Sequence, residues 1–443
     1  MISHTKLAIL LSLTLGLTMI AESASAQGLA DSSWPMFQHD AQHSGRSDDF
    51  RGPRPAPGQK PFEQWKAKLR SRLRGAPAID ASGNVAVGNG KNPLSGFDSA
   101  TGTQLWQSTN HRAGHADRSQ PAAADNGFVY IGARDNKIWG VDPTSTPLSS
   151  WTYKAMHDGD ITTPPTIGQD GTIYMGSEAL GAGWLFAIDP VTHLPKWQAP
   201  GHVVLRGSLK NASPALVKCE DIEEADLMPF TNCHDGAGNR IPNRDGILLV
   251  SIKTEAIALH PHTGAEIWRV TLAKKGYGSR HPCFAPVVSN DGKTAYFNSK
   301  EGLWALNVLD GSPVWSSPFV PKDRQMIQSA AALGADGTLY FGASKKKSAT
   351  FWALNPDASV RWQHDHSVRG KYSNNQAAVD MDGYVYVSFG KYVFGFDGAD
   401  GTVLWEIRNR GSIQSGIALG EDDSLYYGSG KYLVKLVSSD PGS

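Results

Sequence analysis

The sequence predicts an all-β protein, an eight-bladed β-propeller made of four-stranded antiparallel blades. Three observations predict it: a hairpin ending on tryptophan recurs, all but one of the intervals between its copies are similar in length, and one isolated outer strand precedes the first complete copy. The clearest hairpin runs from Ala256 to Trp268. It contains an alternating apolar strand, a tight turn at Thr263 and Gly264, and a second strand that carries the tryptophan.

The tryptophans of these hairpins set the period of the repeat. Their successive spacings are 41, 45, 46, 71, 47, 47 and 43 residues. One interval is long, and the others have the length of a four-stranded propeller blade. The residues that define the period are Trp65, Trp106, Trp151, Trp197, Trp268, Trp315, Trp362 and Trp405.

Each interval contains the same order of elements. A short strand of small residues comes first, followed by an Asp-Gly or Asn-Gly turn, a strand with a Tyr-x-Gly pattern, and the tryptophan hairpin. In the stretch 121–132, alanines precede the turn at Asn126 and Gly127. Small side chains suit a crowded position near a central axis, so the first strand of each interval is expected to be the innermost. We name the four strands A to D from the axis outward.

The two ends of the chain are predicted to share one blade. Three strands follow Trp405, near Gln414, Ser424 and Tyr432, and none ends on tryptophan. The strand around Trp65 supplies the missing outer strand, which closes the ring and leaves no open blade. The propeller is therefore expected over residues 62–438, with a seven-bladed ring and a separate Trp65 segment as the alternative.

The N-terminus has the pattern of a secretory signal peptide over residues 1–26. His4 and Lys6 precede an apolar run over 7–20, and small residues at 24–26 form a cleavage site. A membrane-spanning anchor is the alternative. No cysteine follows that would carry a lipid, so we expect a periplasmic or secreted protein. Residues 27–61 are expected to form a lead segment and linker.

The overall charge is balanced, with 42 basic and 42 acidic residues. A protein that binds nucleic acid through its net charge is therefore excluded, and any cationic surface must be local. We expect no transmembrane segment after the leader and a monomeric protein.

The long interval contains an insertion at about residues 218–245. Cys219 and Cys233 lie in it and are candidates for a disulfide in an oxidising compartment, which would leave Cys283 buried or free. We expect no metal site, because the three cysteines lack zinc-site spacing and the polar residues of the insertion lack EF-hand spacing.

The hairpins carry a family resemblance. Phe97 and Asp98 with Thr101, Gly102 and Trp106 form a pattern that resembles the tryptophan-docking repeat of the pyrroloquinoline-quinone-like (PQQ-like) β-propellers. The resemblance covers nearly all of the chain after the leader. It implies that the eight tryptophans dock between neighbouring blades, a structural role.

The resemblance implies two kinds of function. Quinoprotein dehydrogenases of this family hold PQQ and a calcium ion on the axis, whereas proteins of the BamB type bind partners through the bare ring. This chain has no adjacent cysteine pair and no haem motif. We therefore expect a binding or scaffold protein of the cell envelope without a cofactor, and we identify no catalytic residue. The alternatives are a PQQ-dependent dehydrogenase with calcium and a hydrolase acting on a small anion.

Arginine recurs just before the inner strands, in the loops that lead from strand D to strand A. These loops line one face of a propeller near its channel, so the guanidinium groups are predicted to form a funnel for anions, engaging an envelope protein or an anionic polymer. Solvated charges or surface ion pairs are the alternative. The residues of the predicted funnel are Arg74, Arg118, Arg206, Arg280, Arg324, Arg369 and Arg410.

Overall fold

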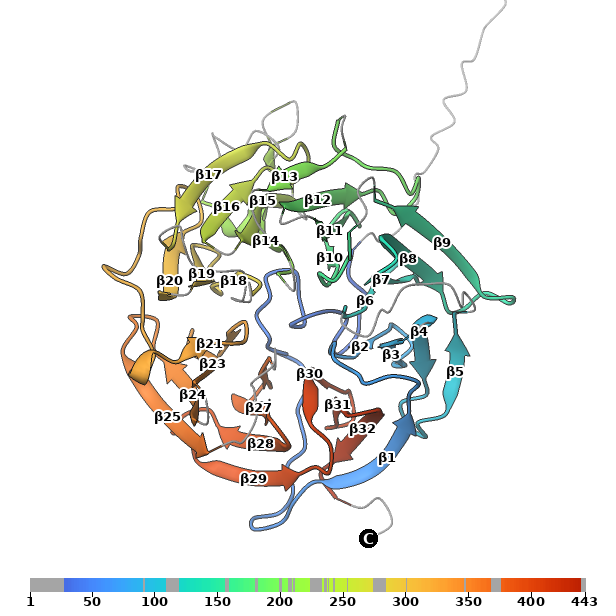
Figure 1. Ribbon diagram of the computed structural model, residues 1–443, viewed down its shortest axis with the longest axis vertical. Coiled ribbons are helices and arrows are strands. Elements are labelled where there is room, and N and C mark those ends of the chain that lie inside the picture. Colours follow the sequence, from blue (N-terminus) through green and yellow to red (C-terminus); the bar gives the residue numbers. More distant parts are fainter. Residues whose placement is uncertain are drawn as a thin grey trace, which may run out of the picture.

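The computed structural model is a ring of eight antiparallel β-sheets around a central axis (Figure 1), which confirms the predicted eight-bladed propeller. The structure describes residues 28–90, 92–108, 119–155, 159–179, 182–198, 201–205, 209, 212–223, 233–234, 237, 239–241, 244–252, 254–273, 284–299, 301–345, 348–367 and 376–439. The residues of the predicted signal peptide, 1–26, lie outside this part of the chain. No helix among the described residues is long and apolar enough to cross a membrane.

The first four blades each have four strands, which follow one another from the axis outward. They are β2 (Ala78–Ile79), β3 (Val85–Asn89), β4 (Asn92–Phe97) and β5 (Gln104–Gln107); β6 (Ala122–Ala123), β7 (Val129–Ala133), β8 (Lys137–Asp142) and β9 (Ser149–Lys154); β10 (Thr166–Ile167), β11 (Ile173–Ala179), β12 (Ala182–Ile188) and β13 (Val203–Leu205); and β14 (Ala215–Lys218), β15 (Asp245–Ile252), β16 (Glu255–Leu259) and β17 (Glu266–Thr271).

The next three blades include two irregular ones. Among the described residues, the fifth blade has three strands, and the sixth has an additional strand paired with its second one. Their strands are β18 (Val287–Val288), β19 (Thr294–Ser299) and β20 (Gly302–Asn307); β21 (Met326–Ile327), β22 (Ala332–Leu333), β23 (Leu339–Lys345), β24 (Ser348–Leu354) and β25 (Val360–Ser367); and β26 (Ala378–Val379), β27 (Tyr384–Phe389), β28 (Tyr392–Asp397) and β29 (Val403–Arg408).

The eighth blade joins the two ends of the chain. It contains β30 (Ile413–Leu419), β31 (Leu425–Ser429) and β32 (Tyr432–Val437), and its outer strand is β1 (Phe62–Lys68). β1 runs antiparallel to β32, with Phe62 opposite Val437 and Lys68 opposite Tyr432. This pairing is the predicted closure by the strand around Trp65.

Most of the inner strands are short, and buried hydroxyl groups lie in them or just before them. The hydroxyl groups of Thr163, Ser329 and Ser415 accept hydrogen bonds from the backbone N–H groups of glycines in the adjacent strand B, at 2.6–3.1 Å. These glycines are the third residues of the Tyr-x-Gly pattern: Gly176, Gly342 and Gly428. These three hydroxyl groups therefore link the start of the inner strand to strand B within one blade.

The N-terminal segment runs inside the ring, which the sequence did not predict. We name residues 34–47 the N-terminal belt. Its carbonyl groups accept hydrogen bonds of 2.7–3.0 Å from N–H groups of the inner strands of six blades. The acceptor–donor pairs are Trp34–Ile79, Pro35–Ala123, Ala41–Leu216, Gln42–Val288, Ser44–Leu333 and Gly45–Val379. The belt thus visits blades one, two, four, five, six and seven in order, and Figure 1 shows this blue segment crossing the centre of the ring.

Side chains of the belt are buried as deeply as those of the core. Trp34 is 1% exposed and packs with the blade that closes the ring. The Gln38 side-chain amide donates to the carbonyl of Ala331 at 2.8 Å. The ring nitrogen Nδ1 of His43 lies 3.0 Å from the carbonyl oxygen of Pro286, and burial lowers the pKa of His43 to about 4. A neutral imidazole therefore donates this bond.

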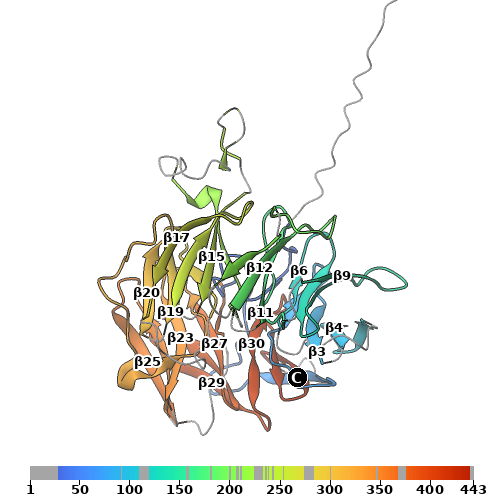
Figure 2. The same cartoon turned by 45° about the horizontal axis from the view of Figure 1, so that its top comes forward.

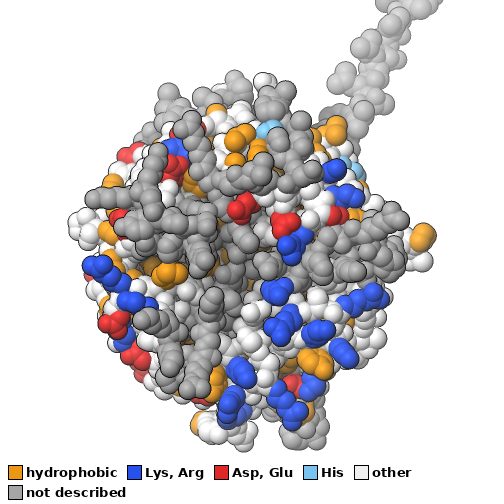
Figure 3. Space-filling view, viewed as in Figure 1, with side chains coloured by type: hydrophobic (Ala, Val, Ile, Leu, Met, Phe, Trp, Pro, Cys, Tyr) orange, Lys and Arg blue, Asp and Glu red, His pale blue; other side chains and the backbone are white. Residues whose placement is uncertain are grey.

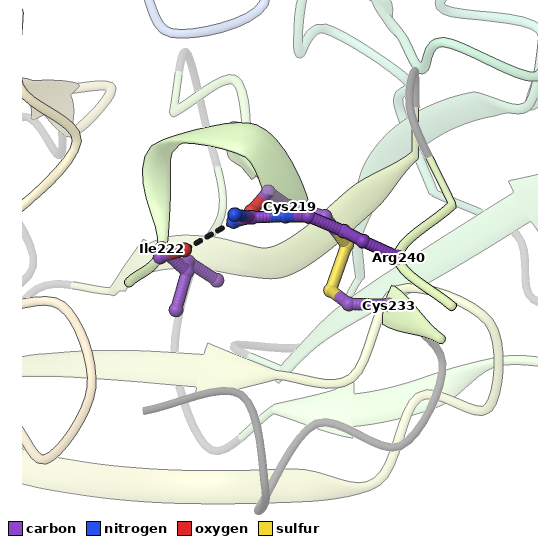
Figure 4. Close-up of a disulfide and its surroundings, with 4 residues drawn as sticks. All are labelled: Cys219, Ile222, Cys233 and Arg240. Atoms are coloured by element: carbon purple, nitrogen blue, oxygen red, sulfur yellow. Dashed lines mark hydrogen bonds between the residues drawn. A yellow bond between two sulfur atoms is a disulfide. The ribbon is translucent and has the colours of Figure 1, made fainter. Parts of the chain in front are cut away.

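The described residues of the insertion in the fourth blade project from one side of the ring (Figure 2). A disulfide joins Cys219 and Cys233, whose Cα atoms are 5.6 Å apart. The guanidinium group of Arg240 donates to the carbonyls of Cys219 and Ile222 (Figure 4). The disulfide and these bonds hold the start and end of the insertion together. Cys283 lies outside the described residues.

Candidate functional site

The structure gives indole hydrogen-bond partners for most of the tryptophans that set the repeat. Six of them donate their indole N–H to a backbone carbonyl outside their own blade, at 2.8–3.2 Å. The pairs are Trp65–Ser99, Trp197–Pro261, Trp268–Val308, Trp315–Pro356, Trp362–Gly398 and Trp405–Pro53. The indole N–H groups of Trp106 and Trp151 are buried without a hydrogen-bond partner among the described residues.

Glycine in the C–D turn lets a tryptophan lie close to the neighbouring blade. Gly102 has a φ of 72°, in the left-handed region that favours glycine. A Cβ atom there would lie 2.6 Å from the ring of Trp65. The glycine of the Thr-Gly turn is therefore explained by its backbone conformation and by the neighbouring tryptophan ring, without a role in ligand binding.

The described arginines of the predicted funnel do not share one pocket. Arg410 lines a groove between the seventh and eighth blades, and Arg324 lines a separate depression together with Glu301. Arg74 donates to the side-chain carbonyl of Gln414 at 3.2 Å. The remaining members, Arg118, Arg206, Arg280 and Arg369, lie outside the described residues.

The groove at Arg410 is strongly basic. We name it the blade-8 groove. It has a volume of about 730 Å³ and is lined by six basic side chains and one carboxylate, that of Glu63. The basic side chains are Lys66, Lys68, Arg72, Arg408, Arg410 and Lys431. Figure 3 shows basic side chains gathered over the part of the ring that Figure 1 assigns to the eighth and first blades.

Most of these cations have no acidic partner among the described residues. Lys66 pairs with Glu63 at 2.7 Å. The other basic groups of the groove form no ion pair within the part of the chain that the structure describes. Arg408 lies over the ring of Tyr392, with its Cζ atom 6.0 Å from the ring centroid. The groove therefore holds an excess of uncompensated positive charge in a protein whose total charge is balanced.

The local sequence accounts for three of the six cations that line the groove, namely Lys66, Lys68 and Arg72. Basic residues occupy every second position from Lys66 to Arg74, and the residues between them include Leu69 and Leu73. Both leucines are buried, at 3% and 1% exposure. Their backbone N–H groups donate to the carbonyls of Lys431 and Gly430, at 2.7 and 3.0 Å. This alternation is the sequence signal for the surface, but the predicted funnel includes only Arg74 of the run.

The groove and the belt lie at opposite ends of the inner strands. The groove is lined by the D–A connection at Asn409 to Gly411 and by the B–C turn at Gly430. The belt instead bonds to the ends of the inner strands that lead into the A–B turns. A ligand approaching the groove face therefore does not meet the belt first.

The described residues do not assemble a metal site for a calcium-bound quinone, and most of the D–A loops lie outside them. The described part of the chain contains no group of three His, Cys, Asp or Glu side chains that could hold a metal ion. The hydroxyl groups of Thr163, Ser329 and Ser415 are already engaged by backbone N–H groups, and the belt occupies the other end of the axis. We derive no reaction step through a quinone.

Comparisons with known proteins agree with this fold. Protein Rv3035 of Mycobacterium tuberculosis (strain H37Rv) is 25% identical over 325 residues, which cover 68% of this chain and 70% of that protein. Quinohemoprotein alcohol dehydrogenase from Comamonas testosteroni has 14% identity and a TM-score of 0.66, with 95% of this chain and 82% of that chain covered. A europium-containing methanol dehydrogenase has 14% identity and a TM-score of 0.63, with 90% of each chain covered.

At these identities the likeness to the two dehydrogenases shows the shared propeller fold alone. A family model gives a more specific result. The PQQ-like model described as outer membrane protein assembly factor BamB matches residues 62–218 and 230–431, which is most of the chain. The chain therefore belongs to this family of PQQ-like, BamB-type β-propellers.

Proposed function

We propose that this protein is an exported β-propeller that acts as a binding or scaffold protein of the cell envelope and engages an anionic partner through its groove face. The observation that carries the proposal is the blade-8 groove, where six basic side chains meet one carboxylate. Clustered like charges repel one another, whereas an anionic ligand stabilises them. The partner is a protein or a polymer with anionic groups.

Two features support export. The N-terminal sequence has the pattern of a secretory leader, and Cys219 and Cys233 form a disulfide. Disulfides persist in oxidising compartments such as the periplasm. A periplasmic or secreted location is therefore part of the proposal.

The tryptophans are proposed to dock the blades and to take no direct part in ligand binding. Trp268 and Trp362, for example, are each 8% exposed and donate to a carbonyl of the next blade. A large aromatic ring held in this way stabilises the interface between two blades. The ligand surface is expected in the loops between the blades.

The binding function is tested on an immobilised anionic polymer. The full chain without its leader is expected to bind polyglutamate or polyphosphate resin, with retention that falls as salt rises. Arg410→Ala should elute at lower salt than the wild type, and Arg324→Ala, in the separate depression, should elute close to it. Equal elution of all three proteins on every anionic resin would contradict the proposal.

The dehydrogenase alternative is tested on the same preparation. Protein incubated with pyrroloquinoline quinone and calcium is expected to bind no quinone and to reduce no dye in the presence of alcohols or sugars. A bound quinone absorbance together with dye reduction would replace the binding proposal with the enzymatic one.

A further inference from the structure

We propose that the blade-8 groove binds closely spaced phosphate groups. This inference rests on the proposed function and narrows the anionic ligand to a chemical class. The groove brings together three segments: the outer strand β1 with the residues after it as far as Arg72, the end of β29 with the connection after it, and the turn between β31 and β32. None of the tryptophan-docking positions takes part in it.

The charge of the groove sets the first requirement on the ligand. Its lining has a net charge of +5, from six basic groups and Glu63. Because Lys66 is already paired with Glu63, the charge that a ligand can neutralise comes mainly from Lys68, Arg72, Arg408, Arg410 and Lys431. A single carboxylate would leave most of these groups without a partner, so a ligand with several negative charges is required.

The size of the groove sets the second requirement. A volume of about 730 Å³ holds a small molecule or a short stretch of polymer. Phosphate places up to two negative charges on one compact group, whereas a carboxylate carries one charge on a longer unit. Adjacent phosphate groups therefore match this density of cations better than a chain of carboxylates does.

The kinds of side chain agree with phosphate. Arg72, Arg408 and Arg410 offer planar guanidinium groups, which bind phosphate oxygens in pairs. Lys68 and Lys431 add mobile point charges beside them. Both lysines are exposed, so solvent and ligand reach them freely.

Isothermal titration with inorganic tripolyphosphate at low salt tests the site. The groove variant is Lys68→Gln with Lys431→Gln. The matched control is Lys60→Gln with Lys154→Gln, which removes the same charge from exposed lysines just before β1 and in the second blade. The groove variant is expected to bind roughly tenfold to thirtyfold more weakly than the wild type. The control should retain an affinity within about twofold, because its lysines lie outside the groove.

A second variant separates a folding defect from a binding defect. Arg410→Gln removes one guanidinium from an exposed connection, and its thermal unfolding should match that of the wild type. Weaker binding in this variant supports the site. Equal loss of affinity in the groove and control variants, or no binding of tripolyphosphate by the wild type, would overturn the inference.

Two further measurements identify the source of the phosphate groups. They also separate a failure of this inference from a failure of the proposed function. Binding of phosphatidylcholine vesicles only when they contain phosphatidylglycerol, lost in the groove variant, would assign the phosphates to lipid headgroups. Tripolyphosphate binding without vesicle binding would assign them to a soluble phosphate compound. If polyglutamate resin retains the wild type but tripolyphosphate does not bind, the phosphate inference fails while the proposed function stands.

Discussion

At the scale of single residues, the contact between the third and fourth blades changes the pKa of Asp245. Asp245 begins β15 in the fourth blade and accepts a hydrogen bond from the N–H of Gln169, in the third blade, at 3.1 Å. Asp170, its acidic neighbour there, pairs with Lys196 at 2.6 Å. Burial and, next, the charge of Asp170 raise the pKa of Asp245 to about 7.

This raised pKa predicts a specific dependence of stability on pH. The folded state retains a proton on Asp245 that the unfolded chain, with a pKa near 3.8, releases. The contribution of this group to the free energy of unfolding therefore falls as pH rises from about 4 to 7 and stays low above that range.

We expect Asp245→Asn to be more stable than the wild type at pH 8, by on the order of 2–4 kcal/mol, because the amide cannot ionise and still accepts the bond from Gln169. At pH 4 the difference should nearly vanish. Urea unfolding at both pH values measures it. An equal difference at both pH values would contradict the assigned cause.

Residues could be predicted from the sequence where their contacts lie within one repeat or the next. The Thr263–Gly264 turn lies within one hairpin, and Trp268 of that hairpin donates to Val308 in the next repeat, so the repeat pattern indicated both positions. The environment of Asp245 comes from residues 76 positions away in the chain. No spacing rule places these two segments together.

At the scale of elements, the N-terminal belt is the largest difference between expectation and structure. The sequence predicts a lead segment and linker over residues 27–61, but the belt supplies acceptors to inner strands around the ring. It does so through backbone carbonyls, which any residue possesses, so the sequence carries little trace of the contact. Only Trp34, Met36 and Phe37 indicate burial.

We expect Trp34→Ala to lower the free energy of unfolding by about 3–5 kcal/mol, because the side chain is 1% exposed and its removal leaves a cavity beside the closing blade. Urea unfolding monitored by circular dichroism measures the change. Phe62→Ala is the control, since Phe62 is 39% exposed, and it should cost about 1 kcal/mol or less. If Trp34→Ala lowered the free energy of unfolding by as little as Phe62→Ala is expected to, the belt would contribute little to stability.

At the scale of the whole molecule, the ring depends on both ends of the chain. β1 pairs with β32 over its full length, and Trp65 donates to Ser99 in the first blade. The sequence predicted this closure because the three strands after Trp405 lack an outer strand with a tryptophan. The isolated strand at Trp65 supplies it. The predicted funnel around the axis stays a prediction, because four of its seven arginines lie outside the described residues. The blade-8 groove itself was not predicted, because its six cations come from three separate segments of the chain.

Shortened chains separate the two contributions of the N-terminus. A chain that starts at residue 48 loses the belt and keeps β1, so we expect a monomeric ring of reduced stability. A chain that starts at residue 69 also exposes the edge of β32, which favours self-association. Light scattering and thermal unfolding measure both effects. A monomeric protein starting at residue 69 that is as stable as the longer one would contradict closure by β1.

The central claim, that an anionic partner binds at the closing blade, is tested most directly by a lysine footprint. Acetylation of each lysine is measured by mass spectrometry with and without saturating polyphosphate or another anionic partner retained by the protein. The account predicts that Lys68 and Lys431 become protected, while Lys60 and Lys154 react as before. Protection of Lys60 and Lys154 with no change at Lys68 and Lys431 would contradict it.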